Sequence, residues 1–301
     1  MSPFDLVTLR LFTLIVEHRS IAGAARANNI AASAVSKRVS DLEATLGIAL
    51  LYRLRDGVEP TPGGHALYRH AKQIDLVIRD LQGELSEYSQ GARGHVRLWA
   101  NTSAVTQFLP EDLAAFVEQY PNVDIDLHEG NSDVVVNAVT TGMADIGIYS
   151  EYFGTTELVS RIYRRDTMML VVPLKHPLAG REKVRFEETT HYDHVGLQEG
   201  SSLQERVLTE ASNKGLHIRT RVHTFGFDGI RRMVEAGLGI AILPQGAVLP
   251  YVGQDNFWAA ALDEPWAKRT LYLVYRDYES LPVVARALIE CLAPDDSAPA
   301  R

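Results

Sequence analysis

A predicted helix over residues 33–46 carries short hydroxyl side chains and a lysine on the face opposite its apolar side. The apolar side is defined by residues that repeat at steps of four, three and four, namely Val35, Val39, Leu42 and Leu46. At about 100° per residue, Ser33, Lys37 and Ser40 point away from that side, with Ser36 on its flank. Such groups can reach base edges and phosphates in a DNA major groove, although an ordinary solvent-exposed face has the same composition.

Two arginines follow this helix in a segment with a turn signal. Arg53 and Arg55 precede the dipeptide Asp56-Gly57, which is favoured in tight hairpin turns, so residues 50–60 are expected to form a two-stranded wing. Beside the helix, these arginines would contact phosphates or the minor groove. The alternative is plain surface charge.

Hydroxyl-rich segments follow two predicted strands and precede two predicted helices. One segment comprises Asn101, Thr102 and Ser103, and the other comprises Gln198, Ser201 and Ser202. Ligands of open α/β sheets collect where strands end and helix N-termini offer free amides. The segments predict a site for a small carboxylate or another polar anion, unless they are ordinary helix caps. Glu199 would oppose an anion, so it points outward or indicates a ligand with an amine or hydroxyl.

Catalytic and metal-binding patterns are weak in this sequence. His191, Asp193 and His194 lie close together, but zinc sites need three or four convergent ligands, and this cluster falls in a predicted loop before a strand. No Gly-rich phosphate loop or nucleophile elbow stands between a strand and a helix. We therefore expect no metal, no cofactor and no enzymatic activity.

The N-terminal residues predict a helix-turn-helix. The first helix places apolar side chains on one face, namely Leu6, Leu9, Phe12, Ile15 and Val16. Ser20 is expected to cap a second helix, and Gly47 is expected to end the third.

A longer helix is predicted after Thr61 and Pro62, a cap followed by a first-turn proline. Its apolar residues alternate at steps of four and three over three heptads: Leu67, Ala71, Ile74, Ile78, Leu81, Leu85 and Tyr88. This narrow stripe favours a dimerising coiled coil, whereas a helix packed on the core of a monomer would more often show a wider apolar face.

The remaining chain alternates between strand and helix patterns. Strands are predicted at 95–100, 123–128, 144–149, 168–173, 194–198, 218–225, 240–244 and 269–276. Helices are predicted at 105–119, 133–141, 203–215, 228–236 and 282–292. The alternation indicates an α/β fold of mainly parallel sheets with helices on both faces, in two subdomains with a cleft between them.

Composition fits a cytoplasmic protein of two or three domains. Of 301 residues, 46% are apolar and 23% charged, and no apolar run is long enough to span a bilayer. A single cysteine excludes an internal disulfide. Residues 1–72 hold nine Lys/Arg against six Asp/Glu, a net of +3, so the overall charge of −8 leaves −11 for the rest. A basic DNA-binding end on an acidic body is consistent with this distribution.

Taken together, these motifs resemble the LysR-type transcriptional regulator family over essentially the whole chain. The resemblance is carried by the run from Leu9 to Arg53, by Thr61-Pro62-Gly63-Gly64, and by the phrases FLPEDLAAFVEQYPNVDIDL, GMADIGIY and VEAGLGIAILP. It implies a winged helix-turn-helix at residues 1–62, a linker helix at 63–92 and an effector domain at 93–301. That domain would resemble type 2 periplasmic binding proteins, with lobe I at about 93–162 and 268–301 and lobe II at about 163–267.

The resemblance also implies partners and further site residues. Additional effector contacts fall at Asn131, Ser132, Tyr149, Phe225, Gly226 and Phe227. The expected DNA-contacting set is Ser33, Ser36, Lys37, Arg38, Ser40, Arg53, Arg55 and Thr61. The family pairs on pseudo-palindromic double-stranded DNA with half-sites about one turn or a multiple apart, assembles further into tetramers, and can contact RNA polymerase. The alternative is a solute-binding or enzymatic α/β domain with an appended DNA-binding head.

One departure from the family pattern affects DNA recognition. Family members often have Ser-Gln at the start of the recognition helix, whereas this chain has Ala31 and Ala32, followed by Ser33. We therefore expect Ser33 to take over the capping role, and sequence preference to depend more on Ser36, Lys37 and the wing.

Overall fold

The computed structural model describes residues 4–54, 57–90, 94–154, 156–254 and 256–294. The chain forms two compact units, Met1–Ser86 and Glu87–Arg301, termed the N-terminal unit and the C-terminal unit. The finer division at residues 62 and 92 stays a prediction. No helix in the described part of the chain combines the length and apolar character needed to cross a bilayer.

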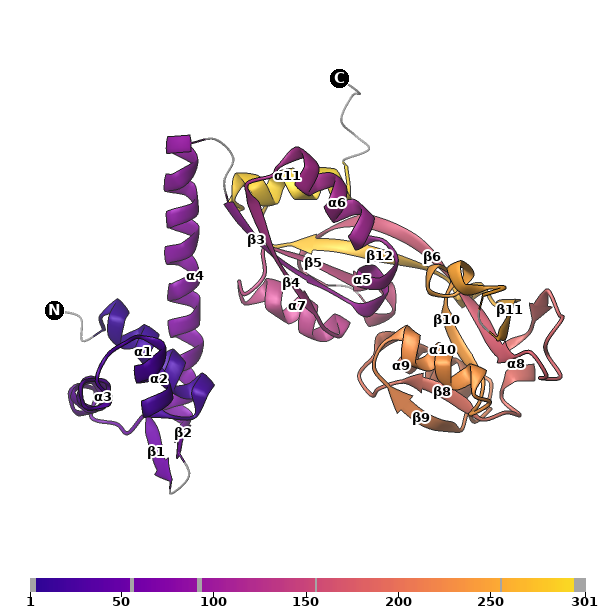
Figure 1. Cartoon of the computed structure of the whole chain (residues 1–301), viewed down its shortest axis with the longest axis horizontal. Coiled ribbons are helices and arrows are strands. Elements are labelled where there is room, and N and C mark those ends of the chain that lie inside the picture. Colours follow the sequence, from indigo (N-terminus) through magenta and orange to yellow (C-terminus); the bar gives the residue numbers. More distant parts are fainter. Residues whose placement is uncertain (1–3, 55–56, 91–93, 155, 255, 295–301) are drawn as a thin grey trace. The chain divides into compact units, whose positions relative to one another are not determined.

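The N-terminal unit is a three-helix head with a two-stranded wing, followed by a long helix (Figure 1). Its elements are α1 (Leu6–His18), α2 (Ile21–Ala27), α3 (Ala32–Leu46), β1 (Leu51–Leu54), β2 (Gly57–Pro60) and α4 (Pro62–Gln90). Ser20 caps α2 as predicted, because its side chain accepts a hydrogen bond from the Gly23 amide at 3.1 Å. Gly47 ends α3 with a φ of 69°, in the left-handed region that glycine tolerates. The winged helix-turn-helix is confirmed.

The head has its own hydrophobic core. Phe12 and Ile15 of α1 pack against Val35 and Val39 of α3, and all four are at most 1% exposed. Full burial of side chains of this size contributes about 1.5–3 kcal/mol each. This packing fixes which face of α3 remains in solvent.

Lobe I of the C-terminal unit has helices on both faces of its sheet. Its strands are β3 (Gly94–Ala100), β4 (Val123–Glu129), β5 (Ile146–Ser150), β12 (Lys268–Tyr275) and the first half of β6 (Val159–Pro173). One face is covered by α5 (Thr102–Gln107), α6 (Leu109–Gln119) and α11 (Val283–Leu292), and the other by α7 (Ser132–Thr140). Helices on both faces of a sheet are what the predicted α/β fold requires.

Lobe II is built around the second half of β6. Its strands are β7 (Lys183–Val184), β8 (His194–Leu197), β9 (Thr220–Thr224), β10 (Ala241–Pro244) and β11 (Phe257–Leu262). Its helices are α8 (Phe186–Thr189), α9 (Ser202–Asn213) and α10 (Phe227–Glu235), with short 3-10 turns η2 (Gln245–Ala247), η3 (Leu249–Tyr251) and η4 (Pro265–Ala267). The turn η1 (Glu151–Phe153) follows β5. Because β6 pairs with β12 and then with β10 and β11, one strand runs through both lobes (Figure 1).

The expectation of mainly parallel sheets was wrong. The sheets are mixed. β3 pairs in parallel with β4 and β5, β11 with β7, and β8 with β9. β12 is antiparallel to β5 and β6, and β6 is antiparallel to β10 and β11. The first half of β6 was missed because Arg161, Arg164 and Arg165 break its apolar pattern. β11 was missed because its three consecutive alanines give no strand signal.

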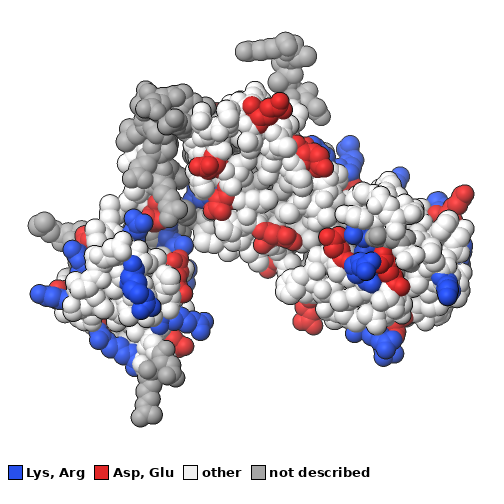
Figure 2. Space-filling view, in the orientation of Figure 1, with Lys and Arg blue, Asp and Glu red and all other residues white. Residues whose placement is uncertain are grey.

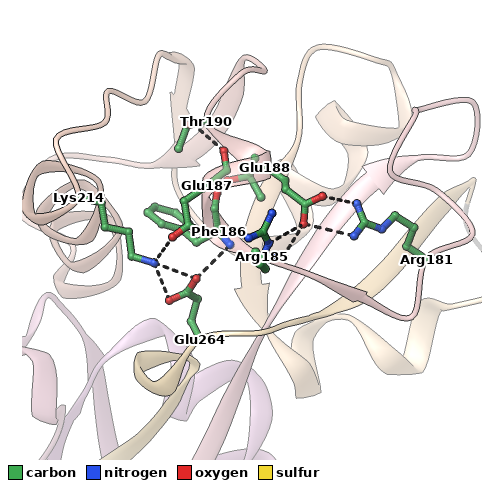
Figure 3. A network of polar contacts seen from close by, with 9 residues as sticks. Arg181, Arg185, Phe186, Glu187, Glu188, Thr190, Lys214 and Glu264 are labelled. Atoms are coloured by element: carbon green, nitrogen blue, oxygen red, sulfur yellow. Dashed lines mark hydrogen bonds and ion pairs between the residues drawn. The ribbon is translucent and has the colours of Figure 1, made fainter.

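A network of ion pairs ties α8 of lobe II to the end of α9 and to the segment before η4 (Figure 3). Lys214 Nζ donates to Glu187 Oε1 at 2.6 Å and to Glu264 Oε2 at 3.0 Å. Arg181 binds Glu188, and this hydrogen bond lowers the pKa of Glu188 to about 2. The network fixes the C-terminal end of α9, whose N-terminal end lies at a cavity between the two lobes.

Candidate DNA-contacting face and interlobe cavity

The outward face of α3 is the one predicted from the sequence. Ser33, Lys37 and Ser40 are exposed and Ser36 is half-buried, while Val39 on the opposite side is 1% exposed. On the visible face of the N-terminal unit, lysine and arginine side chains outnumber acidic ones (Figure 2). A polar, basic surface of this kind suits contact with phosphates and base edges.

The start of α3 differs from the prediction. Ala31 is the N-cap and supplies no side-chain hydrogen bond, and α3 begins at Ala32, so Ser33 already lies in the first turn. The expectation that Ser33 caps α3 was wrong. Its exposed hydroxyl is left for solvent or a ligand.

The predicted arginines have different surroundings. Arg53 of β1 donates to Ser40 Oγ at 3.2 Å, so the wing touches the outward face of α3. Arg38 instead contacts Thr8 Oγ1 at 3.2 Å and Asp5 Oδ2 at 3.5 Å, at the start of α1. Arg55 lies outside the described residues.

Thr61 has a structural role in the head. It is 6% exposed, its hydroxyl donates to the Ala49 carbonyl at 2.8 Å, and it accepts from the Gly64 amide at 3.0 Å. Gly64 is required here, because a Cβ at this position would meet the Leu50 carbonyl oxygen at 2.0 Å. Because the Thr61 hydroxyl already makes these two hydrogen bonds, we omit Thr61 from the proposed DNA-contacting set.

The apolar stripe of α4 changes environment along the helix. Ala71 is 2% exposed and Leu67 packs partly on the core of the head, whereas Ile74 and Leu81 are 39% and 52% exposed. Ile78 is half-buried. The side chains of Leu85 and Tyr88 lie outside the described residues. Ile74 also borders an apolar groove of about 620 Å³ between α4 and the start of α1.

A cavity of about 560 Å³ lies between the two lobes. Lobe I contributes Thr102, Glu129, Gly130, Asn131 and Val134. Lobe II contributes Leu197, Gln198, Ser201, Phe225 and Gly226. These residues lie where strands end and α5, α7, α9 and α10 begin, as expected for a ligand site in an α/β fold. Helix N-termini give the cavity a partial positive potential.

The structure brings six predicted effector residues to this cavity: Thr102, Asn131, Gln198, Ser201, Phe225 and Gly226. Ser132 and Ser202 lie beside it, and their hydroxyls meet at 3.2 Å, which joins the start of α7 to the start of α9. Six predicted residues are therefore in the wall, and two form a polar bridge between the lobes.

Four other predicted residues are used by the fold. Asn101 is 6% exposed and caps α5 through the Ala104 amide at 3.0 Å. Tyr149 and Phe227 are 4% and 2% exposed in apolar cores, and Ser103 is 4% exposed beside a buried arginine. None of the four is among the residues that line the cavity, so their contact with a ligand stays a prediction.

From the sequence, Glu129 was interpreted as the end of a strand and not as a site residue, and Glu199 was considered instead. Glu199 is exposed and does not line the cavity, while Glu129 does, and its Oε1 accepts a hydrogen bond from Thr102 Oγ1 at 2.6 Å. Glu129 is the last residue of β4, so the rule that ligands gather at strand ends would have found it.

A buried ion pair lies next to the cavity. Asp166 of β6 and Arg269 of β12 meet at 2.7 Å, and their side chains are 2% and 1% exposed. Arg269 also donates to Ser103 Oγ at 2.6 Å. Gln107 donates to Asp166 at 3.0 Å and accepts from the Gly246 amide of η2 at 2.9 Å. The cluster links α5, whose start lines the cavity, to lobe II.

Of the histidine cluster, His194 has a structural role. Within the described ranges, His, Cys, Asp and Glu side chains form no group of three suited to a metal ion. His194 is 3% exposed and its Nε2 lies 3.1 Å from the Thr189 carbonyl. Burial lowers the pKa of His194 to about 4.

This buried imidazole predicts acid sensitivity. The unfolded chain binds a proton at a pKa near 6.5, whereas the folded chain resists it until about pH 4. The stability contributed by neutral His194 is therefore present above pH 6.5 and lost as the pH falls toward 4, by at most about 3 kcal/mol. The loss in free energy of unfolding is measured by urea unfolding of the wild type and of His194→Gln, each at pH 7 and at pH 4.5. An equal loss in both proteins would contradict the prediction.

Comparison with known proteins agrees with this architecture. Residues 6–65 match the family described as bacterial regulatory helix-turn-helix protein, lysR family, and residues 89–296 match LysR substrate binding domain. The HTH-type transcriptional regulator CysL of Bacillus subtilis (strain 168) is 27% identical over 240 residues, which is 80% of each chain.

Solved structures share the fold. The structure of full-length CbnR complexed with its target DNA superposes with a TM-score of 0.75 at 18% identity, covering 96% of this chain and 99% of that one. The Synechocystis PCC6803 CcmR regulatory domain in complex with 2-PG gives 0.62 at 21% identity, covering 69% and 100%. The family inferred from the sequence is confirmed: this chain belongs to the LysR family of bacterial transcriptional regulators and carries that family's effector-binding domain.

Proposed function

We propose that two copies of this regulator bind a pseudo-palindromic DNA site through α3 and the wing, and that a small carboxylate in the interlobe cavity controls this binding. The observation that carries the proposal is the 560 Å³ cavity, whose polar walls come from both lobes. CbnR was solved with its target DNA and the CcmR regulatory domain with 2-PG. These structures support DNA binding by the N-terminal unit and ligand binding by the C-terminal unit of this chain. Binding to chromosomal DNA requires a cytoplasmic location.

Control follows from the two-lobed wall. A ligand that touches both lobes has higher affinity for one lobe arrangement, and it shifts the equilibrium by that difference alone. A carboxylate fits because the starts of α7, α9 and α10 have no side-chain caps, so their amides are available to an anion. We propose that the ligand is bound without being chemically converted.

The proposed DNA-contacting residues lie on one side of the head and comprise the exposed Ser33, Lys37, Ser40 and Arg53 and the half-buried Ser36. Arg38 is retained as a weaker candidate because its side chain is 48% exposed but already paired with Asp5. Half-sites about one DNA turn or a multiple apart would match two such heads.

Replacing Lys37 with alanine is expected to weaken DNA binding by about 1–3 kcal/mol per head, since a cation at the centre of the outward face is lost. The measurement is fluorescence anisotropy at fixed salt, on a duplex selected by the wild type from random-sequence DNA and on a random duplex.

Lys183→Ala is the matched control, because Lys183 is an exposed cation of lobe II paired with Asp263. It should leave DNA affinity unchanged. Equal affinities of Lys37→Ala and wild type for both duplexes would exclude α3 as the DNA-contacting helix.

The cavity is tested by filling it. A thermal-shift screen of small carboxylates on the full chain should yield stabilising compounds, and Ser201→Trp should remove their effect because Ser201 lines the cavity and is about 9% exposed. Stabilisation that persists in Ser201→Trp would place the ligand elsewhere.

A further inference from the structure

The two walls of the interlobe cavity have opposite electrostatic character. Glu129 of lobe I is the single acidic side chain among the described lining residues, which include no lysine or arginine. The lining residues described in lobe II are uncharged, and they lie at the starts of α9 and α10. One wall therefore attracts a positive group, and the other attracts a negative one.

The acidic wall is arranged to accept hydrogen bonds. Thr102 Oγ1 donates to Glu129 Oε1 at 2.6 Å, which orients the carboxylate at the end of β4, and no hydrogen bond to Oε2 is made among the described residues. Asn131 lies on the same wall. An ammonium group bound here would neutralise Glu129, whereas a second carboxylate would be repelled by it.

The opposite wall is arranged to donate hydrogen bonds. Ser201 is the N-cap of the 12-residue helix α9 and is about 9% exposed, yet its hydroxyl makes no hydrogen bond within the described structure. Gly226 is the N-cap of α10 and has no side chain that could cap it. Because Ser201 lines the cavity and its hydroxyl has no partner in the described structure, this hydroxyl can donate to a carboxylate bound at this wall.

We infer that the effector is a zwitterion of the α-amino acid class, with its carboxylate at Ser201 and the start of α10, and its ammonium group at Glu129 and Thr102. This inference rests on the proposed function of the cavity. Phe225, which is 77% exposed, and the neighbouring Leu197 and Val134 supply an apolar surface for the side chain of the ligand. Because the two ionic groups bind different lobes, the intact zwitterion bridges them.

The test measures the affinity of the full-length protein for the twenty standard L-amino acids, by thermal shift and then calorimetry. At least one should bind, and its deaminated carboxylate and its decarboxylated amine should each bind at least tenfold more weakly. Glu129→Gln should lower affinity for the amino acid at least tenfold and should not lower affinity for the deaminated carboxylate, which Glu129 repels. Glu199→Gln, an exposed carboxylate outside the wall, is the matched control and should change neither.

Failure of this inference is distinct from failure of the proposed function. A deaminated carboxylate that binds as tightly as the amino acid, or an amino acid whose affinity Glu129→Gln leaves unchanged, overturns the inference. If succinate or a phosphorylated acid binds the wild type but not Ser201→Trp, while no amino acid binds, the cavity is an effector site of another class. If no compound in either set binds in the cavity, both proposals fall.

Discussion

Asp166→Ala is expected to destabilise the C-terminal unit by about 3–5 kcal/mol, because it leaves Arg269 buried without its counter-ion. Both side chains are at most 2% exposed, and Asp166 Oδ2 accepts from Arg269 at 2.7 Å and from Gln107 at 3.0 Å. Urea unfolding of the full chain, monitored by hydrogen exchange in β6 and β12, measures the destabilisation.

The exposed pair Lys183–Asp263 provides the control. Its side chains are 66% and 52% exposed, so Asp263→Ala should cost at most about 1 kcal/mol. The double variant Asp166→Leu, Arg269→Met removes both charges and should be more stable than Asp166→Ala alone. A cost for Asp166→Ala no larger than that for Asp263→Ala would show that the pair contributes little.

The hydrogen-bonded cluster of Asp166, Arg269, Ser103 and Gln107 connects the cavity to other parts of the C-terminal unit. Thr102 lines the cavity, and the next residue, Ser103, accepts a hydrogen bond from Arg269. At the end of α5, Gln107 joins Asp166 to Gly246 of lobe II. A ligand that moves the start of α5 therefore acts on a helix whose other end is fixed between the lobes.

The parts of the fold that the sequence predicts well are set by local patterns. The helix-turn-helix follows from a 3.6-residue apolar period, from the Ser20 cap and from Gly47, all of which act within one or two helical turns. β6 was only half predicted because its charged first half is stabilised by β12, whose register pairs Val159 with Tyr275. Such a distant partner leaves no local signal.

The candidate site divides in the same way. Thr102 and Ser201 were found because residues after strands gather at one edge of a sheet. Ser103 follows the same strand, yet its hydroxyl binds Arg269, a residue 166 positions away. Sequence order identifies which segment reaches the cavity, but tertiary partners decide which of its side chains face it.

The double substitution Ile74→Glu, Leu81→Glu is expected to convert the protein to a monomer and to weaken binding to a two-half-site duplex by about 10²–10⁴-fold. Both side chains are exposed on one stripe of α4, at 39% and 52%, and Ile74 borders the apolar groove beside α1. Paired glutamates at a helix seam would be desolvated and would repel their counterparts. The loss has this size because the second head would no longer be held near its half-site. Sedimentation velocity and fluorescence anisotropy measure the two effects.

Gln73→Glu introduces one glutamate next to Ile74 but about 100° around the helix, so it should leave both assembly and affinity unchanged. The wild type, the double variant and Gln73→Glu should all bind a duplex with a single half-site with the same affinity. In each protein the head keeps its own core of Phe12, Ile15 and Val39. If the double variant remained dimeric and bound the full site as tightly as wild type, the exposed stripe of α4 would not be the pairing surface. The dimer would then have to form through the C-terminal unit, and the spacing of the two heads would be set there.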